Sequence, residues 1–203
     1  MHPNPAFRQD DPDLFARIVG EVGFGMVFLT TPDGPRVAHT PLIPGEDGTI
    51  GFHLARGNAL VRHLDGARAL IVVNGPDGYV SARWYADGAQ VPTWNYLALE
   101  AEGKVRRTDR AELHALLTRI SAHNEARIEG EPWTMDKTPP ATQSRLMDAI
   151  VGFELTVEAW RPTFKLSQNK PADERERLIA GLEAHGSGAI ASLMRTFAPA
   201  ETR

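Results

Sequence analysis

The sequence predicts a mainly β protein with peripheral helices, built as a single domain over residues 1–203. Between residues 26 and 106, short apolar segments of strand length alternate with turns rich in glycine and proline, a spacing typical of a β-barrel or β-sandwich. Helical periodicity is confined to the start of the chain and to the region after residue 108. No linker rich in proline or serine divides the chain, so we expect helices packed around one mostly antiparallel barrel.

The first element is a helix that starts at Asp11-Pro12-Asp13, because aspartate is a favoured N-cap and proline a favoured first helical residue. Three strands separated by turns of proline, aspartate and glycine follow at residues 26–30, 36–42 and 49–54. A continuous apolar run predicts a buried strand at 67–74. The turn residues Gly75-Pro76-Asp77-Gly78 are expected to end it, with a separate short strand at 79–81.

A longer strand is predicted at 94–106, followed by a helix that starts at Thr108-Asp109-Arg110 and has leucine and isoleucine at helical spacing. A short helix at 144–150 leads to a final strand at 151–160, in which apolar and polar residues alternate. Pro171 then opens a helix that is expected to extend to Ala184.

Composition narrows the class of protein. Hydrophobic residues make up 42% of the chain, which is enough for a sizeable core. The lack of cysteine excludes disulfides, thiolate metal sites and cysteine catalysis, and it agrees with a cytoplasmic location. We see no signal peptide and no apolar stretch of membrane-spanning length, so no membrane contact is expected. The formal net charge of −4 argues against a broad nucleic-acid-binding surface.

The segment Lys165–Lys170 is the first candidate binding site. It begins and ends with lysine, and together with Arg161 it forms a run that has three positive charges and no carboxylate. Between the lysines lie a hydroxyl and two amides that can hydrogen-bond a phosphate or a heterocycle, from Ser167, Gln168 and Asn169. The helix expected after this segment would direct backbone N–H groups to the same place. On these residues alone, an anion-binding turn and a solvated basic turn both remain open.

The strand that begins near Val91 is the second candidate. Its alternation places Trp94 and Tyr96 on one face and Asn95 on the other. The two aromatic rings could form a wall beside a planar ligand whose polar edge meets the Asn95 amide. They could equally fill one end of a barrel.

Two further segments follow strands in the first half of the chain. Residues 53–58 turn from a strand toward a short helix and present Arg56 and Asn58, either to a phosphate or only for helix capping. In His39-Thr40-Pro41, the proline predicts a place where the ladder of backbone hydrogen bonds is interrupted. Backbone groups left free there could contact a ligand.

Several classes of site are excluded. The seven histidines do not have the spacing of metal ligands, so we expect no metal site. There is no G-x-S-x-G elbow, no P-loop and no Rossmann glycine fingerprint. No segment combines a helix-turn-helix pattern with a basic recognition helix.

Taken together, the segments resemble the PaiB family over nearly the whole chain. The resemblance rests on blocks that occur in the family's order: Met1-x-Pro3 with Phe7, His39–Leu42, His53–Asn58, Gly75-Pro76 with Tyr79–Ser81 and Trp84-Tyr85, Val91–Tyr96, and Lys165–Lys170. Two mild departures concern Gly57 and Ala59, where the family pattern has alanine and proline, and Ala82-Arg83, where a proline is more usual.

The resemblance implies an FMN-binding split β-barrel like that of pyridoxamine-phosphate oxidase, assembled as a homodimer with FMN at the interface. It implies one group of residues near the flavin phosphate, namely His53, Ala55, Arg56 and Asn58. It implies a second group along the ring, namely His39, Thr40, Pro41 and Leu42, with Trp94 and Asn95 near the ring edge. The remaining flavin contacts are expected from Lys165, Ser167, Gln168, Asn169 and Lys170.

PaiB proteins are described as FMN-binding negative transcriptional regulators, so we expect a cytoplasmic flavoprotein whose regulation is linked to redox state. No catalytic residue can be named from the sequence. One alternative is an FMN-dependent oxidoreductase that acts on an unidentified small molecule. Another is a haem-binding split barrel whose axial ligand is His39, His53 or His63. DNA is a further partner that the family description implies, although the negative charge supports it poorly.

Overall fold

The computed structural model describes residues 3–198 and divides the chain into two compact units. Unit 1 comprises the described parts of Met1–Asp11, Asn74–Leu99 and Arg161–Arg203. Unit 2 comprises Pro12–Val73 and Glu100–Trp160. Three long strands contribute residues to both units, namely β4 (Arg68–Val80), β5 (Thr93–Arg107) and β6 (Ile150–Lys165).

The six strands form a closed barrel in the order β1-β2-β3-β6-β5-β4. The three shorter strands are β1 (Phe24–Thr31), β2 (Gly34–Pro44) and β3 (Thr49–Ala55). The barrel closes where β1 pairs antiparallel with β4, with Met26 opposite Val72. Closure removes the free edges that an open sheet would expose. This architecture confirms the predicted mainly β class.

The barrel core in unit 2 follows from the alternation of side chains along the strands. In β3, Ile50, Phe52 and Leu54 are buried, and Phe52 stacks on Phe153 of β6 with ring centroids 5.5 Å apart. Inward-facing residues therefore recur at every second position, as the period of a strand requires.

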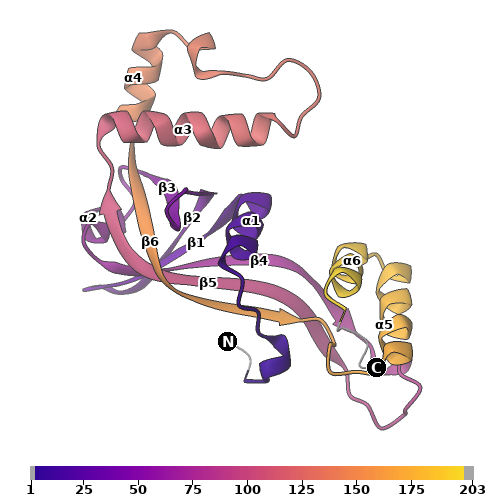
Figure 1. Ribbon diagram of the computed structural model, residues 1–203. Helices are drawn as coiled ribbons and strands as arrows, with labels where there is room; N and C mark the ends of the chain where they lie inside the picture. The colour runs from indigo at the N-terminus through magenta and orange to yellow at the C-terminus, as the bar shows by residue number, and fades with distance from the viewer. Residues whose placement is uncertain (1–2, 199–203) are drawn as a thin grey trace. The chain divides into compact units, whose positions relative to one another are not determined.

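Two helices of unit 2 pack against strand β2 of the barrel, and both can be followed in Figure 1. Helix α1 (Pro12–Val22) places Phe15 against Trp160, with ring centroids 5.4 Å apart. Helix α3 (Arg110–Glu125) begins with a complete capping box of Asp109 and Glu112, in which each side chain accepts a backbone N–H of the other residue. A small apolar cluster joins α3 to β2 and to α4 (Pro140–Asp148), formed by Ile43, Leu113, Leu116 and Met147. Helix α2 (Val61–Leu64) is a single turn.

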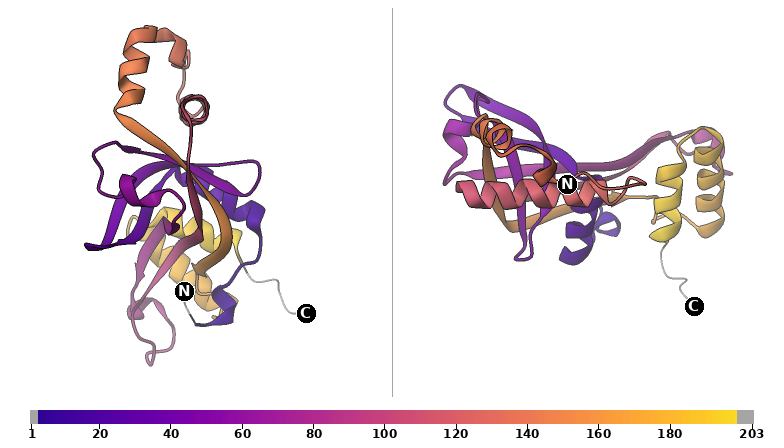
Figure 2. Two further views of the ribbon diagram at one scale, coloured as in Figure 1. Left: turned by 90° about the vertical axis from the view of Figure 1, so that its left-hand side faces the viewer. Right: turned by 90° about the horizontal axis from the view of Figure 1, so that it is seen from above.

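Unit 1 contains helices α5 (Ala172–Ala184) and α6 (Gly188–Thr196), which lie side by side (Figures 1 and 2). Leu178 and Leu182 of α5 and Ile190 and Met194 of α6 are fully buried. Short 3-10 turns occur at Pro5–Phe7 and Ala82–Trp84 in this unit and at Met135–Lys137 in unit 2. Helix α6 was not predicted from the sequence.

One predicted boundary is wrong. The segment from Gly75 to Gly78 does not end a strand, because β4 continues through it to Val80. A Cβ on Gly75 would lie 2.8 Å from Leu97, and one on Gly78 would lie 2.8 Å from Ile190. The lack of a side chain at these glycines therefore lets Leu97 and Ile190 pack closely against β4. Besides forming turns, glycine in a strand often marks such a close approach.

Two further elements are longer than predicted. Helix α4 begins at Pro140, where the fixed φ of proline suits a first turn. Strand β6 continues past Trp160 to Lys165, so the first lysine of the candidate segment is the last residue of a strand. Among residues 3–198, no helix is both long and apolar enough to cross a membrane.

Candidate functional site

Unit 1 contains a cavity of about 260 Å³ that we call the lysine pocket. It lies where the start of β5, the end of β6 and the turn after β6 meet. The sequence-predicted residues among its lining are Asn95, Lys165, Ser167, Asn169 and Lys170. The structure therefore brings five of the predicted site residues together. Trp94 does not line the pocket; it is 53% exposed and meets Tyr79 edge to face, with ring centroids 5.9 Å apart.

The buried polar part of the lysine pocket is a pair formed by Asn95 and Ser167. Asn95 is fully buried and Ser167 is 5% exposed. The Asn95 amide donates to the Ser167 hydroxyl at 3.0 Å, and that hydroxyl donates back to the amide oxygen at 3.1 Å. Ser167 has a φ of 59°, a left-handed conformation that non-glycine residues rarely adopt. Such strain persists only where the surroundings fix it.

The two lysines of the pocket have neutral partners. Lys165 donates to the Thr93 hydroxyl and to the Trp94 carbonyl, both at 2.5 Å. Lys170 donates to the Gln90 side chain at 2.7 Å, and its Nζ lies 5.3 Å from the centre of the Tyr85 ring. Among residues 3–198, no carboxylate forms an ion pair with either lysine. Burial lowers the pKa of Lys165 below its ordinary value, because a partly desolvated ammonium group is less stable.

The remaining residues of the segment shape the turn. The Gln168 side chain accepts a hydrogen bond from the Leu166 N–H at 2.8 Å and donates to the Phe164 carbonyl at 2.5 Å. The Gln168 side chain therefore stabilises the turn that contains it. The Asn169 side chain is exposed. The Lys170 N–H donates a hydrogen bond to the Ser167 carbonyl at 3.0 Å, which completes the turn.

A third cation lies behind the Asn95–Ser167 pair. Arg175 of α5 is 6% exposed, and its guanidinium donates to the Met194 carbonyl. Its Nε has no hydrogen-bond partner among the residues that the structure describes. Asn95 also meets Met194, because its amide lies 3.3 Å from the sulfur. Desolvation lowers the pKa of Arg175, because burial disfavours the charged form, and the negative charge of Glu176 only partly opposes this effect.

In unit 2, the segment His39–Leu42 lies within β2. Pro41 does not interrupt the pairing with β1, since it lies opposite Phe24. On the other side, the pairing with β3 begins only at Leu42, opposite Phe52. The Thr40 hydroxyl donates to the His53 carbonyl at 2.6 Å, just beyond the end of that ladder. The predicted interruption is thus confirmed for one neighbour only. Leu42 is 2% exposed and belongs to the barrel core.

Side chains of the segment His53–Asn58 form hydrogen bonds within the protein, a structural role that the sequence left open beside phosphate binding. The Arg56 side chain donates from Nε to the Asp148 carbonyl at 2.6 Å and from Nη2 to the Ile150 carbonyl at 3.1 Å. Asn58 accepts a hydrogen bond from the Leu60 N–H at 2.9 Å, which forms an Asx turn before α2 and is not a cap of that helix. A guanidinium has five N–H donors, so Arg56 keeps donors for a ligand. Ala55 is exposed beside it.

His53 is the unusual member of this segment. Its Nδ1 is buried and has no hydrogen-bond partner among residues 3–198. Burial lowers the pKa of the imidazole below its ordinary value. A buried, unpaired polar nitrogen is costly, and such groups are uncommon in folded proteins.

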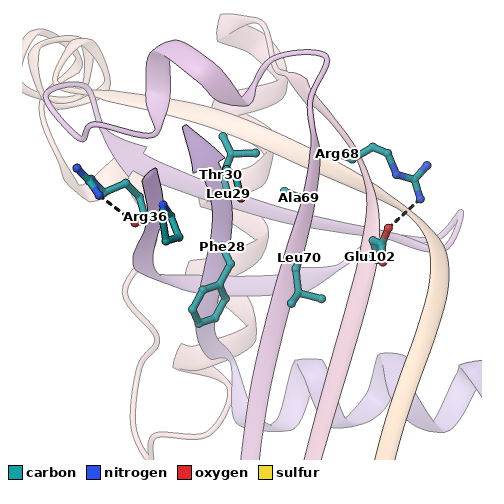
Figure 3. Close-up of a pocket in the computed structure, with 9 residues that line it drawn as sticks. Phe28, Leu29, Thr30, Arg36, Arg68, Ala69, Leu70 and Glu102 are labelled. Atoms are coloured by element: carbon teal, nitrogen blue, oxygen red, sulfur yellow. Dashed lines mark hydrogen bonds and ion pairs between the residues drawn. The ribbon is translucent and has the colours of Figure 1, made fainter. Parts of the chain in front are cut away.

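A second cavity lies on the barrel wall of unit 2 and has a similar volume of about 270 Å³ (Figure 3). Its cations are neutralised or tied to the backbone. Arg68 forms ion pairs with Glu102, at 3.0 Å, and with Glu158, while Arg36 donates to the Pro35 carbonyl. None of the predicted site residues lines this cavity. Charge, and not size, therefore distinguishes the lysine pocket from this second cavity.

Comparison with known proteins identifies the family. A family model described as "Putative FMN-binding domain" matches residues 1–159. The protein "Protease synthase and sporulation protein PAI 2" of Bacillus subtilis is 30% identical over 181 residues, which is 87% of this chain and 86% of that protein. The chain belongs to the PaiB family. FMN is the cofactor that follows from membership of this FMN-binding family. The matched range ends before Lys165, so the lysines of the pocket lie outside it.

Solved structures confirm the split β-barrel fold of this PaiB protein. The FAD- and haem-binding protein of Mycobacterium smegmatis has a TM-score of 0.57 and 18% identity, covering 83% of this chain and 78% of that one. The conserved hypothetical protein Rv2991 of Mycobacterium tuberculosis has a TM-score of 0.58 and 14% identity, covering 84% and 94%. Identities this low show a shared fold and nothing more.

Several residues of the lysine pocket were not among the residues predicted from the sequence. Tyr85, Gln90 and Thr93 line it from loops and a strand start, and no local pattern marks them as a group. Arg175 had a visible signal, because it shares the apolar face of α5 with Leu178, Ile179 and Leu182 at helical spacing. An arginine on the buried face of a helix is rare unless it is paired.

Proposed function

We propose that this PaiB protein is a redox-linked negative regulator that uses FMN as its redox group. The observation that carries the proposal is the match of residues 1–159 to an FMN-binding family. FMN supplies the electron-transfer chemistry when it is bound, and the protein supplies position and electrostatics.

We assign the flavin contacts to the residues that the family resemblance implies. In unit 2 these are His39–Leu42 and His53–Asn58. Support comes from the free donors of Arg56 and from the unpaired Nδ1 of His53. In unit 1 they are Trp94, Asn95 and Lys165–Lys170, supported by two lysines without a carboxylate partner. A cation beside a flavin favours its anionic reduced form.

An absorbance spectrum tests FMN binding directly. The purified chain should be yellow, or should become so with FMN, and a reductant should bleach the flavin band reversibly. Lys165→Ala and Lys170→Ala should weaken FMN binding while the thermal unfolding curve stays cooperative. A colourless protein that takes up no added FMN would contradict the proposal.

We further propose that the protein acts as a homodimer with FMN at the interface. The exposed aromatic pair Tyr79 and Trp94 supports this, because such rings are enriched in interfaces. Light scattering coupled to gel filtration, with and without FMN, should give twice the chain mass. A monomer under both conditions would exclude the dimer.

The proposed regulatory role is tested by measuring DNA binding. A mobility-shift assay with the DNA upstream of the protein's own gene, at low and moderate salt and with oxidised and reduced flavin, tests direct DNA binding. A salt-sensitive complex that depends on redox state is expected if the protein binds DNA itself. Without such a complex, direct DNA binding is excluded, and an FMN-dependent oxidoreductase becomes the better interpretation.

Haem binding is a second candidate, favoured by one observation. His53 has a buried nitrogen without a partner, and histidine is a common axial ligand of haem. Titration with haemin should then give a Soret band that His53→Ala abolishes. No such band, or a band that survives in the variant, would remove this candidate.

A further inference from the structure

We propose that the lysine pocket binds a small organic anion, whose carboxylate or phosphate is held by Lys165 and Lys170 and whose body contacts Tyr85 and Phe7. The proposal concerns the same lysines that the proposed function assigns to FMN, and it is tested separately from flavin binding. Two sources could supply the oxyanion: a second small molecule, or the phosphate of FMN itself. The experiment below distinguishes these sources.

The charges of the pocket are the first argument. The chain has four lysines and a net charge of −4, yet two lysines line one small cavity. Their hydrogen-bond partners are a hydroxyl, a carbonyl and an amide, none of which neutralises a cation. Asp87 acts on Lys170 electrostatically but forms no ion pair with it, and Gln90 bridges the two, since its amide donates to the Asp87 carboxylate at 2.9 Å. An oxyanion in the pocket would give both ammonium groups a charge-assisted hydrogen bond.

The buried cation behind the pocket is the second argument. Arg175 is 6% exposed, and the only hydrogen-bond partner of its side chain among the described residues is a backbone carbonyl. Glu176 acts on it electrostatically but forms no ion pair with it. A buried charge without an ion-paired counterion is costly, so its retention here needs a compensating interaction. Because Asn95 and Arg175 both contact Met194, the positive field of Arg175 acts close to the pocket.

The polar groups lining the pocket are the third argument. Asn95 and Ser167 are both more than nine-tenths buried and line the cavity. The left-handed φ of Ser167 fixes its hydroxyl against Asn95 at a cost in backbone strain. Strained residues of this kind cluster in ligand-binding sites.

The walls and the size of the pocket define the ligand class. Tyr85 and Phe7 are 9% and 4% exposed and offer apolar surface beside the lysines. This combination suits an amphipathic anion better than a bare inorganic ion. The volume of about 260 Å³ lies below the range of roughly 300–1,000 Å³ that is usual for drug-sized ligands. The pocket therefore fits a small carboxylic acid or one end of a larger molecule.

Calorimetric titration of the full chain tests the proposal, with benzoate and inorganic phosphate as probes. One titration uses protein saturated with FMN, and a second uses protein without added FMN. Benzoate should bind saturably, and Lys165→Gln and Lys170→Gln should each weaken it by about tenfold or more. Lys104→Gln is the matched control, since it removes the same charge at an exposed position outside the pocket. Lys165→Arg and Lys170→Arg should retain binding.

The two sources give different results. If the oxyanion is the FMN phosphate, FMN should displace benzoate, riboflavin should not, and the glutamine variants should lose affinity for FMN but not for riboflavin. If it belongs to a second molecule, benzoate should bind equally well to the FMN-loaded protein. Either result supports the pocket as an oxyanion site.

The proposal is overturned if neither probe binds saturably, or if Lys165→Gln and Lys170→Gln bind benzoate as tightly as the unsubstituted chain. Failure of FMN binding is a separate result, because it is read from the flavin spectrum. Titrations without added FMN remain interpretable in that case.

Discussion

The pair formed by Asn95 and Ser167 shows how a single contact fixes a turn. Asn95 is a buried residue of β5. Among residues 3–198, its amide donates to the Ser167 hydroxyl and to the sulfur of Met194 in α6 and to no other group. Thioethers are weak acceptors, so the serine hydroxyl is the partner that matters. Losing it would leave a buried amide without a strong hydrogen bond.

We therefore predict that Ser167→Ala and Asn95→Ala each lower the free energy of unfolding by about 1–3 kcal/mol. The double variant should lose less than the sum, because both substitutions break the same interaction. Urea unfolding of the four proteins measures the coupling. Ser187→Ala is a control, since Ser187 caps α6 without a side-chain hydrogen bond. Strictly additive losses would show that the pair is not coupled.

His53 gives a prediction about pH. Its pKa in the folded chain lies below the ordinary value of 6.5, because burial opposes the charged form. As pH falls through 6.5, the unfolded chain takes up a proton at this position before the folded chain does, so this contribution to stability is lost. The free energy of unfolding should therefore fall less between pH 7.5 and pH 5 in His53→Gln than in the unsubstituted chain. If His53→Gln lost as much stability over this pH range as the unsubstituted chain, His53 would not be the cause of the loss.

Among the elements, those with strong local signals were predicted well. Helix starts in the structure are marked by Pro12 as the first residue of α1, by Asp109 as the N-cap of α3 and by Pro171 as the N-cap of α5. The extent of β4 could not be predicted, because the same glycines that signal a turn also permit close packing. Only the positions of Leu97 and Ile190, distant in sequence, decide between these roles.

In the candidate site, too, local signals were predicted from the sequence, whereas contacts between distant segments were not. Lys165–Lys170 and Asn95 were predicted as site residues from their residue types and their order in the chain. The sequence could not show that Asn95 is buried with Ser167, or that Tyr85 and Gln90 complete the pocket, since these contacts join segments about 80 residues apart. Arg56 and Asn58 were marked equally well, but their hydrogen bonds to Asp148, Ile150 and Leu60 became visible only in the fold.

Strand packing provides a prediction at this scale. A Cβ on Gly103 of β5 would lie 1.8 Å from the backbone oxygen of Thr156 in β6. Because a strand backbone cannot move aside as a side chain can, Gly103→Ala should lower the free energy of unfolding by more than about 2 kcal/mol. Gly88→Ala, where no atom lies within 4 Å of the added carbon, should be close to neutral. Equal stability of the two variants in urea would contradict this packing.

At the scale of the whole molecule, the division into two units bears on the prediction of a single domain. Strands β4, β5 and β6 each contribute residues to both units. Breaking a strand in one unit therefore removes support from its continuation in the other. Cooperativity of this kind is what distinguishes one folding domain from two.

We predict one unfolding transition for the full chain. Tryptophans provide the probes, since Trp84 and Trp94 belong to unit 1 and Trp133 and Trp160 to unit 2. Variants that keep only one pair should unfold in urea at the same midpoint, which should also match the midpoint of far-UV circular dichroism. Two separate midpoints would show that the units unfold independently.

The burial of Lys165 has a consequence for its chemical reactivity. An ammonium group that desolvation destabilises loses its proton at a lower pH than an exposed one, so more of it is a nucleophilic amine at neutral pH. Amine-reactive acetylating reagents, followed by peptide mass spectrometry, should therefore modify Lys165 faster than the exposed Lys104. Bound benzoate should slow that acetylation selectively, so that one residue reports occupancy of the pocket without any change to the protein.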